Sequence, residues 1–210
     1  MEAASIPAGS PPSDPGPLRG RSLYDSVRRA ASAGAGWIQI REKDLDARSL
    51  VELARFAVAE TRALAARVLI NDRLDVALAA NAAGIHLGEK SLPLETVIEW
   101  RRSTGRVDFL IGVSCHSLDS ARAAERGGAD YIFFGPVFET PSKAAFGAPQ
   151  GIERLREVCA SVEIPVLAIG GVSLENARAC IAAGAAGIAA IRLFQDAADS
   201  AELAARLRAI

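Results

Sequence analysis

Apolar and polar positions alternate along this chain as short apolar runs followed by amphipathic stretches. Seven runs of four or five residues, rich in Val, Ile and Phe, have the length and composition of buried β-strands. We expect strands at 37–41, 68–71, 84–87, 109–113, 131–134, 166–169 and 187–191.

Between these runs, apolar residues recur at the three- and four-residue spacing of amphipathic helices. The spacing predicts helices over 23–32, 47–65, 75–81, 94–103, 118–126, 151–161 and 174–183. Strands that are near-continuous apolar runs and alternate with amphipathic helices are typical of a parallel sheet covered on both faces. Because right-handed crossovers repeated this often close a sheet on itself, we predict an α/β fold, a TIM-type (β/α)8 barrel.

The N-terminal residues do not follow this pattern. Residues 1–20 are rich in Pro, Gly and Ser with few large apolar side chains, so we expect a disordered or loosely attached tail. Proline cannot donate a hydrogen bond to a sheet, which makes this a poor place for the strand that should open the barrel. We predict that this first strand is missing or replaced by the tail, or that the chain starts downstream of it. Residues 21–210 are expected to form a single barrel domain.

Composition and charge narrow the class of protein. Half of the 210 residues are hydrophobic and only 5% are aromatic, which is typical of an α/β enzyme core. A net charge of −1 gives no electrostatic reason to expect nucleic acid or an anionic membrane surface as partner. No apolar run reaches the roughly 18 residues of a membrane span. The three cysteines lack metal-ligand spacing, so we interpret Cys159 and Cys180 as buried thiols and expect a reducing, cytoplasmic setting.

In a parallel barrel the active site lies at the carboxyl ends of the strands, so the residues that follow each strand are the candidates. The loop 135–143 contains Thr140, Ser142 and Lys143, a combination typical of an anion-binding site. A second anion site is predicted at Gly170 and Gly171, whose bare backbone N–H groups can approach a phosphate; a plain left-handed turn is the alternative.

The other strand ends add cationic side chains and a carboxylate. Arg41 and Lys43 are two residues apart, so both can face the barrel mouth, although surface ion pairs with acidic neighbours are an alternative. Asp72 follows the next strand, where it could also cap a helix. This set suits a polyphosphate held with a divalent cation better than a hydrolytic triad. His86 and His116 have the spacing of neither a metal pair nor a triad, and we interpret them as hydrogen-bonded structural residues.

Taken in order, the motifs resemble a known family. They are Gln39-x-Arg41-Glu42-Lys43-Asp44, Asn71-Asp72-Arg73, Gly84-Ile85-His86-Leu87-Gly88, Gly112-Val113-Ser114-x-His116, the 135–143 loop and Ile169-Gly170-Gly171-Val172. Over about residues 22–209 the chain resembles thiamine phosphate synthase and its relative, the TenI-type thiazole tautomerase.

The resemblance to thiamine phosphate synthase implies a transferase of thiamine biosynthesis. Its substrates would be hydroxymethylpyrimidine diphosphate and thiazole phosphate, and its products thiamine phosphate and diphosphate. The resemblance implies Mg²⁺ as cofactor, bound by Asp72, and leaves a homo-oligomer open.

The resemblance also implies roles for the substrate-binding residues. Gln39 and Asn71 would lie against the pyrimidine, and Arg41 and Lys43 would bind the diphosphate. Ser114 and Lys143 would act as catalytic residues near the departing oxygen. The thiazole phosphate would contact the remaining set: Thr140, Ser142, Gly170, Gly171, Ile191 and Arg192.

Three positions depart from the family pattern. Ser91 stands where the synthases usually carry a second acidic Mg²⁺ ligand, which Glu89 or a water could replace. Arg192 stands where a small residue is usual, and it could clamp the thiazole phosphate or pair with Asp196. Pro136 stands where the tautomerases place a catalytic His, and proline has no group to transfer a proton. The synthase is therefore favoured, with the tautomerase and a non-catalytic phosphate-binding paralogue as alternatives.

Overall fold

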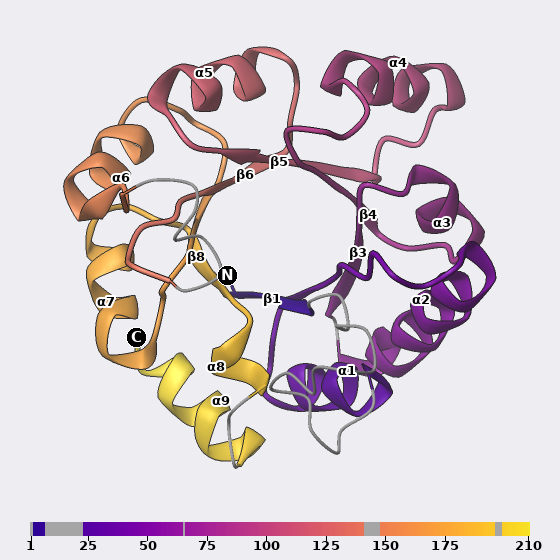
Figure 1. Cartoon of the computed structure of the whole chain (residues 1–210), viewed down its shortest axis with the longest axis horizontal. Coiled ribbons are helices and arrows are strands. Elements are labelled where there is room, and N and C mark those ends of the chain that lie inside the picture. The colour runs from indigo at the N-terminus through magenta and orange to yellow at the C-terminus, as the bar shows by residue number, and fades with distance from the viewer. Residues whose placement is uncertain (1, 7–22, 65, 141–147, 196–198) are drawn as a thin grey trace.

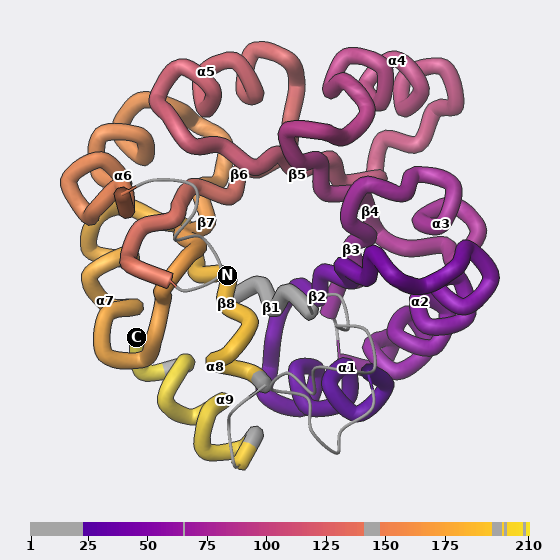
Figure 2. The backbone as a smooth tube through the Cα atoms, viewed as in Figure 1, coloured from indigo at the N-terminus to yellow at the C-terminus, as the bar shows by residue number. Residues whose placement is uncertain are grey.

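The computed structural model describes residues 2–6, 23–64, 66–140, 148–195 and 199–210, and within them parallel strands close into a barrel (Figure 1). Each strand pairs with its neighbours in chain order, and the last pairs with the first, so the chain circles the barrel once (Figure 2). The strands are β1 (Glu2–Ile6), β2 (Trp37–Ile40), β3 (Arg67–Asn71), β4 (Gly84–Leu87), β5 (Leu110–Cys115), β6 (Tyr131–Phe134), β7 (Val166–Ile169) and β8 (Gly187–Ala190). The predicted TIM-type barrel is confirmed.

Helices surround the strands on the outside of the ring (Figure 1). They are α1 (Leu23–Ser32), α2 (Ala47–Thr61) with the 3₁₀ turn η1 (Arg62–Leu64), α3 (Leu74–Ala79), α4 (Leu94–Thr104), α5 (Leu118–Arg126), α6 (Gly151–Cys159), α7 (Leu174–Ala182), α8 (Arg192–Gln195) and α9 (Ser200–Arg208). The seven predicted helices are present: α1 and α5 have the predicted boundaries, and the other five differ by one to four residues at an end, because helix ends are decided by local capping. The apolar spacing did not predict the two helices after β8.

Strand β1 corrects the prediction that the first barrel strand is missing. Its residue Ala3 lies opposite Trp37 of β2 on one side and opposite Ala189 of β8 on the other. The strand ends at Ile6, immediately before the first proline, so it lies within the segment expected to be a tail. Without β1, the edges of β2 and β8 would be open. Their unpaired backbone groups provide hydrogen-bond partners, so that residues 2–6 form a strand in spite of their weak β-propensity. Residues 7–22 lie outside the described residues, so the tail predicted there stays a prediction, as does the boundary at residue 21.

The barrel has two apolar layers. Outside the strands, buried Val, Leu, Ile and Ala side chains pack between strands and helices. Inside, the floor is a second cluster of large side chains: Trp37, Leu69, Tyr131, Phe133, Leu167 and Ala189. Gly112 makes room for it, because a Cβ there would overlap the Tyr131 ring. The interior is therefore a packed core and not a pore.

Cys180 is fully buried and Cys159 is half-buried, and burial raises the pKa of each thiol to about 11. Both thiols are therefore protonated and unreactive at neutral pH. The prediction of a buried thiol is confirmed for Cys180, whereas Cys159 is only partly buried.

None of the helices in the described ranges is long and apolar enough to cross a membrane.

Candidate active site

A polar layer lies directly above the apolar floor. Side chains alternate along a strand, so the residue two positions beyond a floor residue also points inward. Gln39 follows Trp37 in this way, and Asn71 follows Leu69 on the neighbouring strand. The Nε2 atom of Gln39 donates a hydrogen bond of 2.9 Å to Oδ1 of Asn71. The Gln39 side chain is only 2% exposed, and its Oε1 atom has no partner among the described residues. A buried acceptor without a donor is costly, so this atom is suited to receive one from a ligand.

His86 occupies the same layer on the next strand, β4, where it lies opposite Asn71 in the strand register. Its Nδ1 atom lies 3.1 Å from the Tyr131 hydroxyl and its Nε2 atom lies 2.9 Å from the Ser114 hydroxyl. The ring also packs on Phe133 at a centroid distance of 4.2 Å. Burial, helped by the positive charge of Arg41, lowers the pKa of His86 to about 3, so the imidazole is neutral. His86 is hydrogen-bonded, as predicted, but one partner is a candidate catalytic residue.

The lowered pKa of His86 makes the stability of the protein depend on pH. Between about 3 and its ordinary value of 6.5, the unfolded chain binds a proton at this ring that the folded protein does not. The free energy of unfolding should therefore fall as pH is lowered below about 6.5, by at most about 1.4 kcal/mol per pH unit from this group. Urea unfolding between pH 7 and 4 measures the slope. His86→Gln should have a shallower slope than the wild type, and an equal slope would contradict the assignment.

Two cations follow β2 at the barrel mouth. Arg41 is half-buried and Lys43 is exposed, and neither forms an ion pair with another described residue. The alternative of surface ion pairs with acidic neighbours is therefore not seen among the described residues, and one such neighbour, Asp46, instead caps α2 by accepting from the Ser49 backbone N–H at 3.0 Å. The positive charge of Arg41 also contributes to the lowered pKa of His86. Both cations are therefore available to an anion.

Asp72 follows β3 with an unusual backbone. Its φ of 68° lies in the left-handed region, which a residue other than glycine enters at a cost of order 1 kcal/mol. Its backbone N–H donates to the carbonyl of His86 at 2.9 Å. Its exposed carboxylate forms no hydrogen bond or ion pair with another described residue, although it interacts electrostatically with the neighbouring Arg73. The alternative interpretation as a helix cap is wrong, since α3 has Arg73 at its N-cap and no side-chain cap bond. The strained backbone thus presents a carboxylate free to bind a ligand.

Gly170 and Gly171 form a left-handed turn after β7, with φ of 92° and 65°. A Cβ on Gly170 would lie 2.5 Å from Cα of Pro136, so the turn packs tightly on the loop after β6. The Phe138 backbone N–H donates to the Gly170 carbonyl at 2.9 Å, and Nδ2 of Asn176 donates to the Gly171 carbonyl at 2.9 Å. The carbonyls are thus occupied, while neither glycine N–H donates to another described residue. The turn can therefore offer two N–H donors to an anion.

The loops after β4 and β5 are joined around the mouth. The Ser91 hydroxyl is engaged within its own loop, because its Oγ accepts a hydrogen bond from the Gly88 N–H at 2.7 Å and closes a turn. Glu89 lies 3.8 Å from Nε2 of His116, whose Nδ1 hydrogen-bonds the Gly135 carbonyl. His116 is therefore also hydrogen-bonded, as predicted, and it ties the loops after β4, β5 and β6 together.

The remaining predicted site residues stand at the same end of the barrel or outside the described residues. Thr140 is half-buried in the loop after β6, and Ser142 and Lys143 lie outside the described residues. Ile191 is half-buried after β8, and Arg192 is exposed at the first position of α8. Asp196, the alternative partner of Arg192, also lies outside the described residues.

The comparison with known proteins agrees with this geometry. Residues 13–194 match the family model described as thiamine monophosphate synthase. The chain belongs to this family. A thiamine-phosphate synthase of Moorella thermoacetica is 45% identical over 191 residues, which are 91% of this chain and 89% of the relative. The family resemblance predicted from the sequence is thereby confirmed.

Solved structures extend the comparison to the fold. Thiamine phosphate pyrophosphorylase from Pyrococcus furiosus superposes with a TM-score of 0.84 at 35% identity, covering 99% of this chain and 94% of that one. A 3-hexulose-6-phosphate synthase superposes with a TM-score of 0.67 at 17% identity, covering 100% and 99%, and shows the shared barrel fold alone.

Two residues that support the site of this thiamine monophosphate synthase family member were missed by sequence reasoning. The sequence places Tyr131 only in a predicted strand, and Asn176 only in the helix predicted over 174–183. The glycine at position 112 is a sequence signal for Tyr131, because any side chain at that position would overlap the Tyr131 ring. Which polar group its hydroxyl contacts is decided by the closure of the barrel and could not be predicted.

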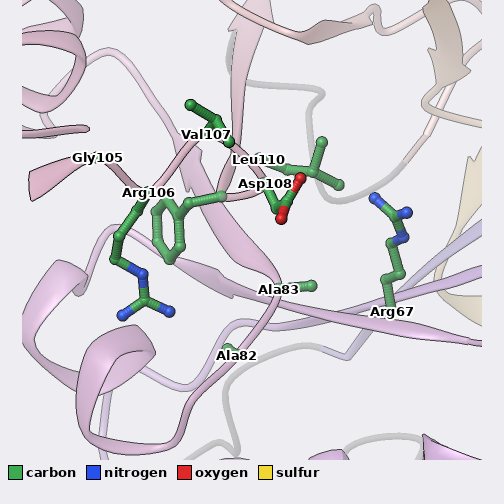
Figure 3. A pocket seen from close by; sticks show the side chains of 9 residues that line it. Arg67, Ala82, Ala83, Gly105, Arg106, Val107, Asp108 and Leu110 are labelled. Carbon is green, nitrogen blue, oxygen red and sulfur yellow. The ribbon is translucent and has the colours of Figure 1, made fainter. Parts of the chain in front are cut away.

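A hollow at the opposite end of the barrel is separate from this site. Its lining residues precede or begin β3, β4 and β5, and include Arg67, Ala83, Arg106, Asp108 and Leu110 (Figure 3). Since active sites of such barrels form at the carboxyl ends of the strands, we assign no part of the site to this hollow.

Proposed function

We propose that this protein is a thiamine-phosphate synthase. It would join hydroxymethylpyrimidine diphosphate to thiazole phosphate, with release of diphosphate. The observation that carries the proposal for this chain is the buried, unpartnered Oε1 of Gln39 beneath a mouth lined by unpaired charges. An aminopyrimidine supplies N–H donors for such a floor, and its diphosphate reaches the cationic rim.

The pyrimidine would lie on the neutral polar layer. Gln39 Oε1 would accept from its amino group, and the Gln39–Asn71 hydrogen bond holds that acceptor in place. The neutral His86 adds no charge to the floor. Because the floor is rigid and dry, it fixes the direction in which the methylene carbon points.

The rim would stabilise the departing anion. The bond between the methylene carbon and the diphosphate oxygen breaks with its electron pair going to the diphosphate, which leaves a pyrimidinyl-methyl cation. Arg41, Lys43 and Ser114, with Lys143 from the loop after β6, would bind the negative charge that develops on that oxygen. The ring nitrogen of the thiazole then donates its lone pair to the cation, and no proton has to be moved.

The thiazole phosphate would occupy the other side of the mouth. The N–H groups of Gly170 and Gly171 are held ready by the bonds to Phe138 and Asn176. Thr140, Ser142, Ile191 and Arg192 complete this phosphate-binding set in the proposal. The two anionic groups would thus be separated across the mouth, which aligns the nucleophile with the methylene carbon.

The residues of the mouth fit Mg²⁺. The described residues contain no group of three His, Cys, Asp or Glu side chains suited to hold a metal by themselves, but Mg²⁺ usually binds one or two carboxylates with waters and substrate phosphates. Asp72 offers one such carboxylate, while Ser91 is engaged in its turn. Mg²⁺ held there would neutralise charge on the diphosphate. We also propose a cytoplasmic setting for the reaction.

Turnover with both substrates tests the proposal. Purified protein with hydroxymethylpyrimidine diphosphate, thiazole phosphate and Mg²⁺ should release diphosphate and form thiamine phosphate in equal amounts. Omitting the thiazole phosphate is the control, and should leave no thiamine phosphate. Absence of product from the complete mixture would refute the synthase. Conversion of the thiazole carboxylate tautomer would indicate the tautomerase, and saturable phosphate binding without either reaction would indicate a non-catalytic paralogue.

A further inference from the structure

Three side chains form a line of hydrogen bonds from the apolar floor to the mouth. Tyr131 lies in the floor, His86 is above it, and Ser114 is at the carboxyl end of β5. Tyr131 is 0% exposed and His86 is 2% exposed, whereas Ser114 is half-buried. The line therefore begins in a dry interior and ends at a hydroxyl that a ligand can reach.

Burial decides the direction of the hydrogen bonds in this line. The Tyr131 hydroxyl remains protonated because burial raises the pKa of the phenol. Its O–H must find an acceptor, and the partner in contact with it is Nδ1 of His86. A neutral imidazole carries one proton, so if Nδ1 accepts, the proton is on Nε2. Nε2–H then donates to Oγ of Ser114, whose own O–H is left to donate elsewhere.

The opposite tautomer would be costly and would work against an anion. With the proton on Nδ1, the ring would donate to the Tyr131 oxygen and leave the buried phenolic O–H without an acceptor. Nε2 would then accept the Ser114 O–H, so that Ser114 would turn only lone pairs toward the mouth. Lone pairs repel a diphosphate oxygen. Only one of the two arrangements both satisfies the floor and attracts an anion.

We propose that Tyr131 is a positioning residue that acts through His86 to turn the Ser114 hydroxyl proton toward the departing diphosphate. The inference deepens the proposed function and rests on it, because it takes Ser114 as a diphosphate contact. Gly112 is needed for the arrangement, since a side chain there would displace the Tyr131 ring. Trp37 and Phe133, at ring-centroid distances of 4.5 and 5.5 Å, hold that ring in place.

The tautomer of His86 can be measured without any substrate. Nitrogen-15 NMR of ring-labelled protein should find the proton on Nε2 and none on Nδ1 at neutral pH. In Tyr131→Phe, which removes the donor and keeps the ring, a substantial share of the proton should move to Nδ1. A wild-type protein with the proton on Nδ1 would overturn the inference, and this result does not depend on whether a variant folds.

Binding of inorganic diphosphate with Mg²⁺ tests the consequence. Calorimetry should find roughly ten- to a hundredfold weaker binding in Ser114→Ala, since a hydrogen bond to a charged group is lost. Tyr131→Phe alone should weaken diphosphate binding about tenfold. The double variant Tyr131→Phe with Ser114→Ala should bind diphosphate no more weakly than Ser114→Ala alone. If the two losses of affinity add in the double variant, Tyr131 supports the fold and does not act through Ser114. Tyr24→Phe is the matched control, because Tyr24 is 39% exposed on α1, and it should leave binding unchanged.

Kinetics separate failure of this inference from failure of the proposed function. In an active synthase, Tyr131→Phe should lower kcat and leave the KM for thiazole phosphate unchanged. If the wild type turns over and the losses of diphosphate affinity from Tyr131→Phe and Ser114→Ala add in the double variant, the hydrogen-bond line is rejected and the synthase is kept. If the wild type does not turn over but the two losses of affinity do not add, the line is kept as part of a diphosphate-binding site and the synthase is rejected.

Discussion

Replacing Asp72 with Asn is expected to lower Mg²⁺-dependent thiamine phosphate formation by on the order of a hundred- to a thousandfold. The side chain keeps its size but loses the charge that holds the metal. The fold should be retained, because Asn tolerates the left-handed backbone, with φ of 68°, as well as Asp does. The carboxylate forms no hydrogen bond with another described residue, and its neighbour Arg73 is held by Asp75, so the loop should stay folded. Steady-state turnover across a Mg²⁺ titration, together with the melting temperature, measures both effects.

Two control variants separate the metal role of Asp72 from a general effect of charge. Asp75→Asn removes a carboxylate three residues away that binds Arg73 at 2.6 Å, so activity should stay close to that of the wild type. Ser91→Ala removes the bond to the Gly88 N–H and should cost far less than Asp72→Ala. Equal losses in Asp72→Ala and Ser91→Ala would show that the metal assignment is wrong.

Replacing Gly171 with Ala is expected to damage both the stability and the thiazole phosphate site. The new Cβ would overlap the Glu139 carbonyl and approach Cβ of Phe138 to 2.8 Å, so the loop after β6 must move. Since that loop and this turn together form the proposed phosphate site, the KM for thiazole phosphate should rise by about tenfold or more. The melting temperature should fall by more than the few degrees that left-handed strain alone would cost.

Gly105 supplies a matched control for this variant. Its φ of 67° nearly equals the 65° of Gly171, but a Cβ there meets nothing within 4 Å. Gly105→Ala therefore pays only the strain of the left-handed backbone, about 1 kcal/mol, and should melt a few degrees lower with an unchanged KM. If the two variants lose equal stability and keep equal KM values, the close packing of Gly171 has no functional consequence.

Much of the fold could be predicted from the chain by itself. Strands β4, β6 and β7 have the predicted limits. β6 and β7 are continuous apolar runs, and β4 is interrupted only by His86. Arg41, Asp72 and Gly171 could be placed at one end of the molecule without coordinates, because all parallel strands of a barrel deliver their carboxyl ends to the same mouth. Strand β1 could not be predicted, because its pairing comes from β2 and β8, which are distant in sequence.

The sequence by itself determined which side chains reach the mouth, since side-chain alternation along each strand is a local property and successive strands joined by helices run parallel. Only the tertiary structure decided what those side chains do there. It left Gln39 Oε1 without a donor, put Asp72 in a left-handed backbone and joined His86 to both Tyr131 and Ser114. These contacts join residues on different strands, and their distances follow from barrel closure and exclusion of water, which no local pattern of residues encodes.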